Sequence, residues 1–195
     1  AYVRSKRKAA LEVGLRAEEH HLPADTTTAE VRAVVERLNA DAAVDGILVQ
    51  LPLPAGCDER AILDAIAPEK DVDGLHPVNA GKLAAGRDDG LVPCTPLGVM
   101  RLLAEAGCDP RGKDAVVIGR SPLVGRPMAH LLVRADATVT VCHAQTRDLE
   151  AKVRGAEIVV AAAGSPGLVR AGWIRPGAVV IDVGLTRGAD GKLHG

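Results

Sequence analysis

Apolar runs and helical patterns alternate along the second half of the chain. Four runs are candidate strands, at residues 115–118, 137–142, 157–162 and 178–183. Helical patterns separate the first three runs, and another helix is expected over 97–106, between Pro96 and Gly107. Strands that are apolar on both faces and alternate with helices are typical of a parallel sheet covered by helices on both sides. We therefore predict a Rossmann-like α/β domain over residues 94–195.

The first half also alternates helices and strands. Helices are expected over residues 2–13, 28–39, 58–66 and 80–85, and strands over 15–22 and 47–51. The clearest signal is the helical spacing of Val31, Val35 and Leu38, with threonines ahead of it as caps. We predict a second α/β domain over residues 1–93, so that the chain folds as two domains around a cleft.

Composition narrows the class of protein. The formal net charge is −1, the chain has one tyrosine, one tryptophan and no phenylalanine, and its four cysteines include no C-x-x-C pair. This composition argues against a disulfide framework, a zinc site, and nucleic-acid bases stacked on aromatic side chains. No apolar run is long enough to span a bilayer. We expect a cytoplasmic protein that holds no metal and binds neither nucleic acid nor membrane.

A glycine loop follows the first candidate strand of the second half. Residues 119–127 join that strand to a helical pattern, which is the geometry that aims backbone N–H groups at a phosphate. Gly119 and Gly125 lie six residues apart, so the loop differs from G-x-G-x-x-G. The functional interpretation is a wider dinucleotide loop, and the alternative is an ordinary strand-to-helix turn. Its place after the first strand of a parallel sheet favours the dinucleotide site.

The end of the next strand bears on which dinucleotide is bound. Enzymes that prefer NAD usually place a carboxylate there, but none occurs between Cys142 and Asp148. A cation such as Arg120 would instead favour the 2′-phosphate of NADP. Arg120 could also be an ordinary solvated arginine of the loop. His143 and Thr146 could line the same pocket, and Thr146 could equally cap the next helix.

Three features of the first half could carry chemistry. Tyr2 and Lys6 are four residues apart and share a helix face, although residues 4–8 also resemble a solvated basic surface. Gln50 is polar in an apolar strand and needs hydrogen-bond partners, which core backbone could supply as well as a site. Asp73 lies in the turn 70–74, which either presents a carboxylate at the edge of a cleft or is simply a capped turn.

Seven segments taken together resemble one family. They are residues 2–6, 45–54, 70–74, 93–96, 119–127, 140–143 and 181–184, in the family's order and over nearly the whole chain. The family is that of the bifunctional methylenetetrahydrofolate dehydrogenase/methenyltetrahydrofolate cyclohydrolases of the FolD type. The resemblance implies oxidation of 5,10-methylenetetrahydrofolate with NADP+ and hydrolysis of the methenyl product to 10-formyltetrahydrofolate. It also implies a homodimer and a role in one-carbon metabolism and purine biosynthesis.

The resemblance further implies residue roles. Lys6 matches the catalytic lysine, and Gln50 matches the glutamine that holds and tunes it. Asp73 matches the aspartate that bonds the pterin ring, and Tyr2 the tyrosine that packs on the folate; these four form the expected catalytic set. The expected substrate-binding residues are Tyr2, Lys6, Val49, Gln50, Leu51 and Asp73, and the expected cofactor contacts are Gly119, Arg120, Ser121, Gly125 and Leu185.

Two departures from the family's pattern leave alternatives open. Ala144 stands where many members carry a residue able to bond the 2′-phosphate of NADP. Members also carry more chain at both ends, so we expect an incomplete catalytic domain. The alternative to the bifunctional enzyme is a truncated, non-catalytic fragment that binds a nucleotide or a folate. A DNA-binding protein that uses residues 4–8 is a third interpretation, and it predicts a salt-sensitive DNA affinity.

Overall fold

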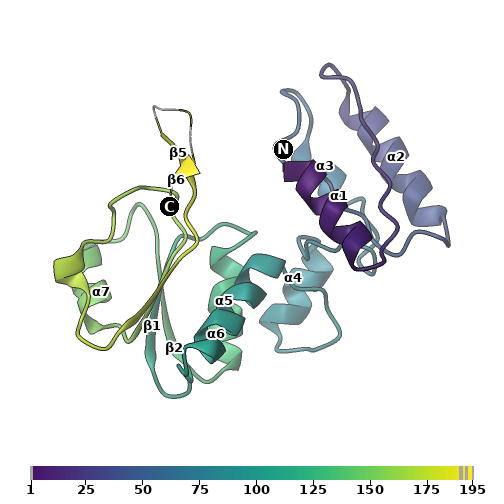
Figure 1. The fold of residues 1–195 in the computed structure, drawn as a ribbon. Coiled ribbons are helices and arrows are strands. Elements are labelled where there is room, and N and C mark those ends of the chain that lie inside the picture. The colour runs from purple at the N-terminus through teal and green to yellow at the C-terminus, as the bar shows by residue number, and fades with distance from the viewer. Residues whose placement is uncertain (1, 189–190, 192, 195) are drawn as a thin grey trace.

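The second half of the chain forms a parallel sheet (Figure 1). The computed structural model describes residues 2–188, 191 and 193–194, with side chains described for 5–186, 188 and 191. The strands are β1 (Asp114–Ile118), β2 (Thr138–Cys142), β3 (Ile158–Ala161) and β4 (Val179–Asp182), in the order β2-β1-β3-β4. All three neighbouring pairs are parallel. The predicted Rossmann-like sheet is confirmed, and the carboxyl ends of its strands share one edge.

Helices cover both faces of this sheet. The covering elements are α5 (Cys94–Glu105) and α6 (Gly125–Arg134) on one face, and α7 (Leu149–Gly155) and the 3-10 turn η1 (Ala171–Trp173) on the other. Val117 and Val160 pack with α5 and α6, whereas Val116 and Val159 pack with α7. Alternate residues of one strand therefore enter different cores, because side chains alternate along a strand. This double burial explains why the central strands β1 and β3 are continuous apolar runs, whereas the outer strands β2 and β4 are less buried.

The first half is built from helices around a separate core. Its helices are α1 (Tyr2–Glu12), α2 (Thr28–Ala40) and α3 (Glu59–Leu63). Thr27 and Glu30 form a capping box at the start of α2, in which Glu30 N donates to the Thr27 hydroxyl and Thr27 N donates to the Glu30 carboxylate. The core of this half consists of Val31, Val35, Ile47, Ile62 and Ile66.

The two strands predicted in the first half do not form. Within the described part of the chain, residues 15–22 have no ladder, and residues 47–51 make a single parallel bridge, between Ile47 and Asp71. A strand needs a neighbour for its backbone groups, and no other described segment pairs with either stretch. Their apolar side chains are only partly covered: Leu15 is 62% and Leu48 is 39% exposed.

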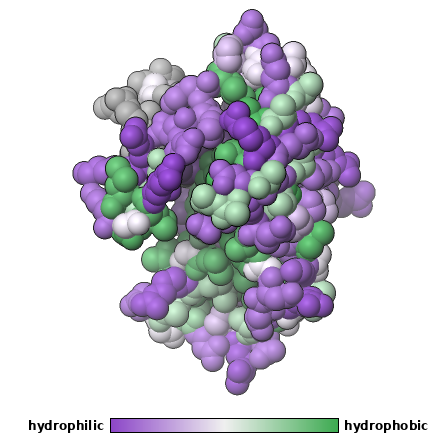
Figure 2. Space-filling view, turned by 90° about the vertical axis from the view of Figure 1, so that its right-hand side faces the viewer, coloured by the Kyte–Doolittle hydropathy of each residue, from purple (hydrophilic) through white to green (hydrophobic). Residues whose placement is uncertain are grey.

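On the face of the molecule in Figure 2, hydrophobic residues gather in the middle, between more hydrophilic regions above and below.

A fourth helix, α4 (Pro77–Ala84), lies between the two halves (Figure 1). It starts three residues before the predicted position because His76 caps it, with its ring Nδ1 accepting from Val78 N at 3.1 Å. Leu83 of α4 is buried in the core that α5 and α6 share with the sheet. A short antiparallel pair, β5 (Thr186–Arg187) and β6 (Leu193–His194), follows the sheet. No helix in the described ranges is long and apolar enough to cross a membrane.

Candidate functional site

Lys6 and Gln50 meet in the first half. Lys6 is half-buried on α1, and its Nζ donates to Gln50 Oε1 at 3.4 Å. The other end of the same amide is also engaged, because Gln50 Nε2 donates to the Leu51 carbonyl at 2.9 Å. The amide therefore has a fixed orientation, with its oxygen turned to the lysine. Gln50 itself is exposed, so the alternative of a core amide is wrong.

Asp73 is the third polar group of this region. Burial raises the pKa of the Asp73 carboxyl, and the charge of Asp71 raises it further. The nearby positive charge of Lys6 acts in the opposite direction and lowers the pKa of Asp73. Lys6 and Asp73 are thus close enough to interact electrostatically. An ammonium group, an amide and a carboxyl group of raised pKa can together hydrogen-bond a polar heterocycle and move a proton.

The remaining predicted substrate residues are placed less directly. Tyr2 belongs to α1, but its side chain lies outside the described residues. Val49 is half-buried and packs against the core of the first half, so this side chain also has a structural function. Leu51 is half-buried and supplies the carbonyl that orients Gln50. Their contacts with a folate stay predictions.

The turn that carries Asp73 is held by two charged neighbours that sequence reasoning did not single out. Lys70 Nζ donates to three carbonyls at the end of α2, those of Leu38 at 3.1 Å, Asn39 at 2.8 Å and Asp41 at 2.8 Å. Asp71 is 1% exposed. Its Oδ2 accepts hydrogen bonds from His76 N at 2.8 Å and Asn79 Nδ2 at 3.0 Å. No cluster of His, Cys, Asp and Glu side chains in the described part of the chain could hold a metal ion.

The glycine loop of the second half requires both of its glycines. Gly119 has φ +121°, and a Cβ there would lie 2.5 Å from the Ala162 carbonyl oxygen. A Cβ on Gly125 would lie 2.1 Å from the Gly119 oxygen. Ser121 Oγ accepts from Val124 N at 3.1 Å and so fixes the turn into α6. Tight backbone packing between Gly119 and the start of α6 is the arrangement expected of a loop that receives a phosphate.

Charges at the end of β2 favour an anion at this loop. Arg120 is exposed and forms no ion pair with the side chains that the structure describes. Asp148 is the first carboxylate after β2 and caps α7, where its Oδ1 accepts from Ala151 N at 3.3 Å. Thr146 is therefore not the cap of α7; its Oγ1 accepts from His143 N at 2.8 Å instead. An exposed cation with no ion pair among the described side chains, and a carboxylate already used as a cap, are compatible with a ribose 2′-phosphate.

A pocket of about 270 Å³ lies at the carboxyl ends of β3 and β4. Its lining includes Gly164, Ser165, Pro166, Gly167, Asp182 and Thr186. Thr186 Oγ1 donates to the Gly164 carbonyl at 2.7 Å, so two segments of the lining are joined. Leu185, the residue expected at the nicotinamide end, is next to this lining and 69% exposed. Sequence reasoning missed residues 164–167, although a Gly-Ser-Pro-Gly turn directly after a buried strand was a usable signal.

The fold and these loops define an α/β nucleotide-binding protein with a second, polar site in its first half. The model of the tetrahydrofolate dehydrogenase/cyclohydrolase catalytic domain matches residues 1–73, and that of the family's NAD(P)-binding domain matches residues 93–195. The chain therefore belongs to the tetrahydrofolate dehydrogenase/cyclohydrolase family.

Individual relatives agree with this assignment. The chain is 58% identical to the bifunctional protein FolD of Anaeromyxobacter dehalogenans, over 100% of this chain and 69% of that protein. It superposes on the bifunctional enzyme FolD of Campylobacter jejuni with a TM-score of 0.95 and 48% identity, covering 98% of this chain and 68% of that one. A FolD structure from Trypanosoma brucei, complexed with NADP cofactor and inhibitor, gives a TM-score of 0.92 and 49% identity over 97% of this chain and 65% of that one.

Proposed function

We propose that the chain oxidises 5,10-methylenetetrahydrofolate to 5,10-methenyltetrahydrofolate with NADP+ and hydrolyses the product to 10-formyltetrahydrofolate. The observation that carries the proposal is the meeting of Lys6, Gln50 and Asp73 in one half of a chain whose other half has a nucleotide loop. Membership of the family supplies the substrate class. The proposal places the division between the folate half and the cofactor half at about residue 93.

The second half fits NADP. Gly119 and Gly125 allow the close backbone packing of the loop, and Ser121 holds the turn into α6. Arg120 offers the 2′-phosphate a guanidinium that forms no ion pair with the described side chains. Leu185 lies beside the pocket where the nicotinamide would be bound. NADP+, when bound, supplies the acceptor of the hydride. The protein's own contribution is to hold that acceptor opposite the folate half.

The dehydrogenase step depends on the alignment of the folate's methylene carbon with the nicotinamide more than on acid–base chemistry. The methylene carbon lies between two nitrogens, so loss of a hydride leaves a cation that both nitrogens delocalise. In the proposal Asp73 bonds the pterin ring, Tyr2 packs on it, and Val49 and Leu51 complete the folate site. These residues fix the carbon at a distance from which the hydride can transfer.

The cyclohydrolase step requires a proton to be moved. Water adds to the methenyl carbon and loses a proton, one carbon–nitrogen bond breaks, and the released nitrogen takes up a proton. Lys6 is the group proposed to carry the proton, and the Gln50 oxygen at 3.4 Å holds its Nζ in place.

Initial rates on this chain test the proposal. Formation of NADPH from methylenetetrahydrofolate and NADP+ reports the first step, and loss of the methenyl absorbance reports the second. We expect both activities and slower hydride transfer with NAD+. Binding of NADP+ and folate without turnover would favour the non-catalytic fragment. A strong preference for NAD+ would contradict the role of Arg120.

The assembly and location of the protein form the last part of the proposal. A homodimer that joins through the cofactor halves rests on the resemblance to the family. A cytoplasmic location and the absence of nucleic-acid or membrane partners rest on the composition of the chain. Light scattering coupled to size-exclusion chromatography tests the dimer, and a monomer at micromolar concentration would contradict it.

A further inference from the structure

Asn79 lies where the two halves of the chain meet. It is a residue of α4, it is 2% exposed, and all three of its polar contacts run outside its own helix. Its Nδ2 donates to the Pro68 carbonyl at 2.7 Å and to Asp71 Oδ2 at 3.0 Å. Its Oδ1 accepts from Leu91 N at 3.2 Å. One buried amide therefore joins the turn before Asp73 to the segment that leads into the second half.

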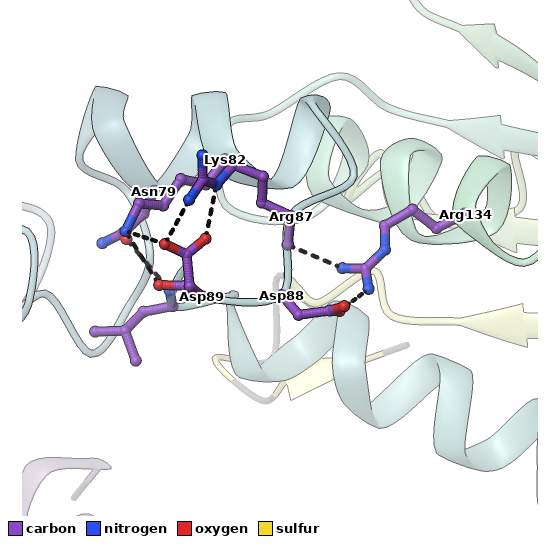
Figure 3. A network of polar contacts seen from close by, with 7 residues as sticks. Asn79, Lys82, Arg87, Asp88, Asp89 and Arg134 are labelled. Atoms are coloured by element: carbon purple, nitrogen blue, oxygen red, sulfur yellow. Dashed lines mark hydrogen bonds and ion pairs between the residues drawn. The ribbon is translucent and has the colours of Figure 1, made fainter.

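The helix that carries Asn79 precedes the division at residue 93 but packs against the cofactor half. Leu83, one turn further along α4, is 3% exposed in the core formed with α5, α6 and the sheet. The loop 86–91 adds polar links, which Figure 3 shows. Lys82 Nζ donates to the Asp89 carbonyl at 3.1 Å, and Arg134 of α6 forms an ion pair with Asp88. We conclude that α4 and this loop are attached to the cofactor half by apolar packing and by polar contacts.

On the side of the first half, Asn79 contacts the turn 70–74, which carries Asp73. Asp71 precedes Asp73 by two residues, and it pairs with Ile47, which leads to Gln50. Gly74, directly after Asp73, packs so closely that a Cβ there would lie 2.7 Å from the Leu91 carbonyl oxygen. Both backbone groups of Leu91 are thus engaged. Its N–H donates to Asn79, and its carbonyl oxygen lies close to Gly74. Asp73 is therefore attached to the cofactor half more directly than Lys6 is.

We propose that Asn79 is a positioning residue for hydride transfer, which fixes the Asp73 turn at a set distance from the cofactor. This inference rests on the function proposed above. Hydride transfer joins a carbon bound by one half to a nicotinamide bound by the other, and a misplacement of about 1 Å can lower such a rate about 10²-fold. The water step uses Lys6 and Gln50 of the first half and needs no such alignment.

The test compares two asparagines of matched chemistry. Asn39 also bonds backbone at both ends of its amide, to the Ala65 carbonyl at 2.7 Å and from Ala67 N at 2.9 Å, but entirely within the first half. We expect Asn79→Ala to lower kcat of the dehydrogenase at least about 10-fold more than kcat of the cyclohydrolase, with the Kd for NADP+ unchanged. Asn39→Ala should lower both rates by one common factor.

The possible results separate the two proposals. If Asn79→Ala lowers both kcat values equally, as Asn39→Ala does, Asn79 only supports the fold and this inference is overturned. If the wild-type chain transfers no hydride at all, the proposed function fails and the inference falls with it. Should Asn79→Ala not fold, Asn79→Ser retains a hydroxyl for Pro68 or Leu91 and gives the same comparison of rates, with thermal melting as the check on folding.

Discussion

The two halves of the chain hold their functional segments by different means. In the second half the glycine loop is fixed by backbone pairing on both sides of β1: Gly119 N donates to the Cys142 carbonyl at 2.8 Å, and Ala162 N donates to the Ile118 carbonyl at 2.7 Å. In the first half the segment that ends at Gln50 has one bridge to Asp71. Its neighbours are held by side chains instead, chiefly those of Lys70, Asp71 and Asn79.

This difference determines how each site can be damaged. A site fixed by a backbone ladder tolerates many side-chain changes but not an added Cβ at a point of close approach. A site fixed by a few buried polar side chains fails when one of them is removed, because the partner is left without a hydrogen bond. Substitutions in the two halves should therefore separate into changes of cofactor binding and changes of folate chemistry.

The largest expected effect is the loss of the water step on substitution of Lys6. Lys6→Met removes the group that carries the proton, and general acid–base catalysis is worth about 10²–10⁴-fold. We expect cyclohydrolase kcat to fall by about 10³-fold, with a smaller loss of dehydrogenase activity and an unchanged Kd for NADP+. Lys8→Met is the matched control, because Lys8 lies on the same helix with a side chain 80% exposed. Full cyclohydrolase activity in Lys6→Met would refute the assignment.

An added methyl group at Gly125 should give the next largest effect, and only in the cofactor half. A Cβ there would lie 2.1 Å from the Gly119 oxygen and 2.8 Å from Arg120 N, so the backbone of the loop must shift. We expect Gly125→Ala to weaken NADP+ binding about 10²-fold, a loss of about 3 kcal/mol. Cyclohydrolase activity should change little. Isothermal titration with NADP+ measures the affinity.

Gly155→Ala is the control for this change. A Cβ on Gly155, in α7, would meet nothing within 4 Å. A helical glycine without such contacts gains about 0.5–1 kcal/mol of stability when it becomes alanine. If both variants bind NADP+ like the wild type, the close approach at Gly125 has no function in cofactor binding.

The substitution Arg120→Ser should have a smaller and more selective effect. It removes the cation proposed for the 2′-phosphate, and a hydrogen bond to a charged group is worth about 1.5–3 kcal/mol. We expect KM for NADP+ to rise about 10-fold or more and KM for NAD+ to stay the same. Arg111→Ser is the control, because Arg111 pairs with Asp136 at the opposite edge of the sheet. An equal rise for both cofactors would show that Arg120 does not contact the 2′-phosphate.

The contrast between backbone pairing in the second half and side-chain contacts in the first also explains which strands could be predicted from the sequence. The run 115–118 lies within β1 and the run 157–162 contains β3, because burial on both faces makes a central strand continuously apolar. The run 47–51 has the same appearance and partly the same burial, since Ile47 is buried, but it forms no ladder with the described residues. An apolar pattern reports burial, whereas pairing depends on which segment lies alongside.

The residues of the candidate site also divide into those that the sequence predicts and those that only the structure shows. Lys6 and Gln50 were predicted from motifs that resemble one family, although 44 residues separate them and no spacing rule joins them. The supports of the site, Asp71 and Asn79, were missed. Each is a polar residue in a stretch that reads as an ordinary turn or helix start, and only the structure shows that they are buried together. Tertiary pairs of buried polar groups leave no periodic signal in a sequence.

The smallest expected effect concerns the stability of the folate half, and its sign follows from Asp73. Because burial raises the pKa of this carboxyl, the folded chain holds the proton more tightly than the unfolded chain does. Folding stability therefore falls as pH rises from the ordinary carboxyl pKa through the raised one, and the penalty is complete above both. Asp73→Asn removes the penalty, so we expect Tm at pH 7 to rise, on the order of a few degrees at most for a chain of this size.

The pH dependence tests the cause of this gain. Below the ordinary carboxyl pKa, Asp73 is protonated in both folded and unfolded chains, so the difference in Tm between wild type and Asp73→Asn should vanish there. In the wild type, the positive charge of Lys6 offsets part of the cost of the buried Asp73 carboxylate. In a Lys6→Met background this offset is lost, so the gain in Tm from Asp73→Asn at pH 7 should grow. Asp45→Asn, which changes an exposed carboxylate of the same half, is the control for a loss of charge alone. A gain that is independent of pH would mean that packing, rather than the buried charge, sets the stability of this turn.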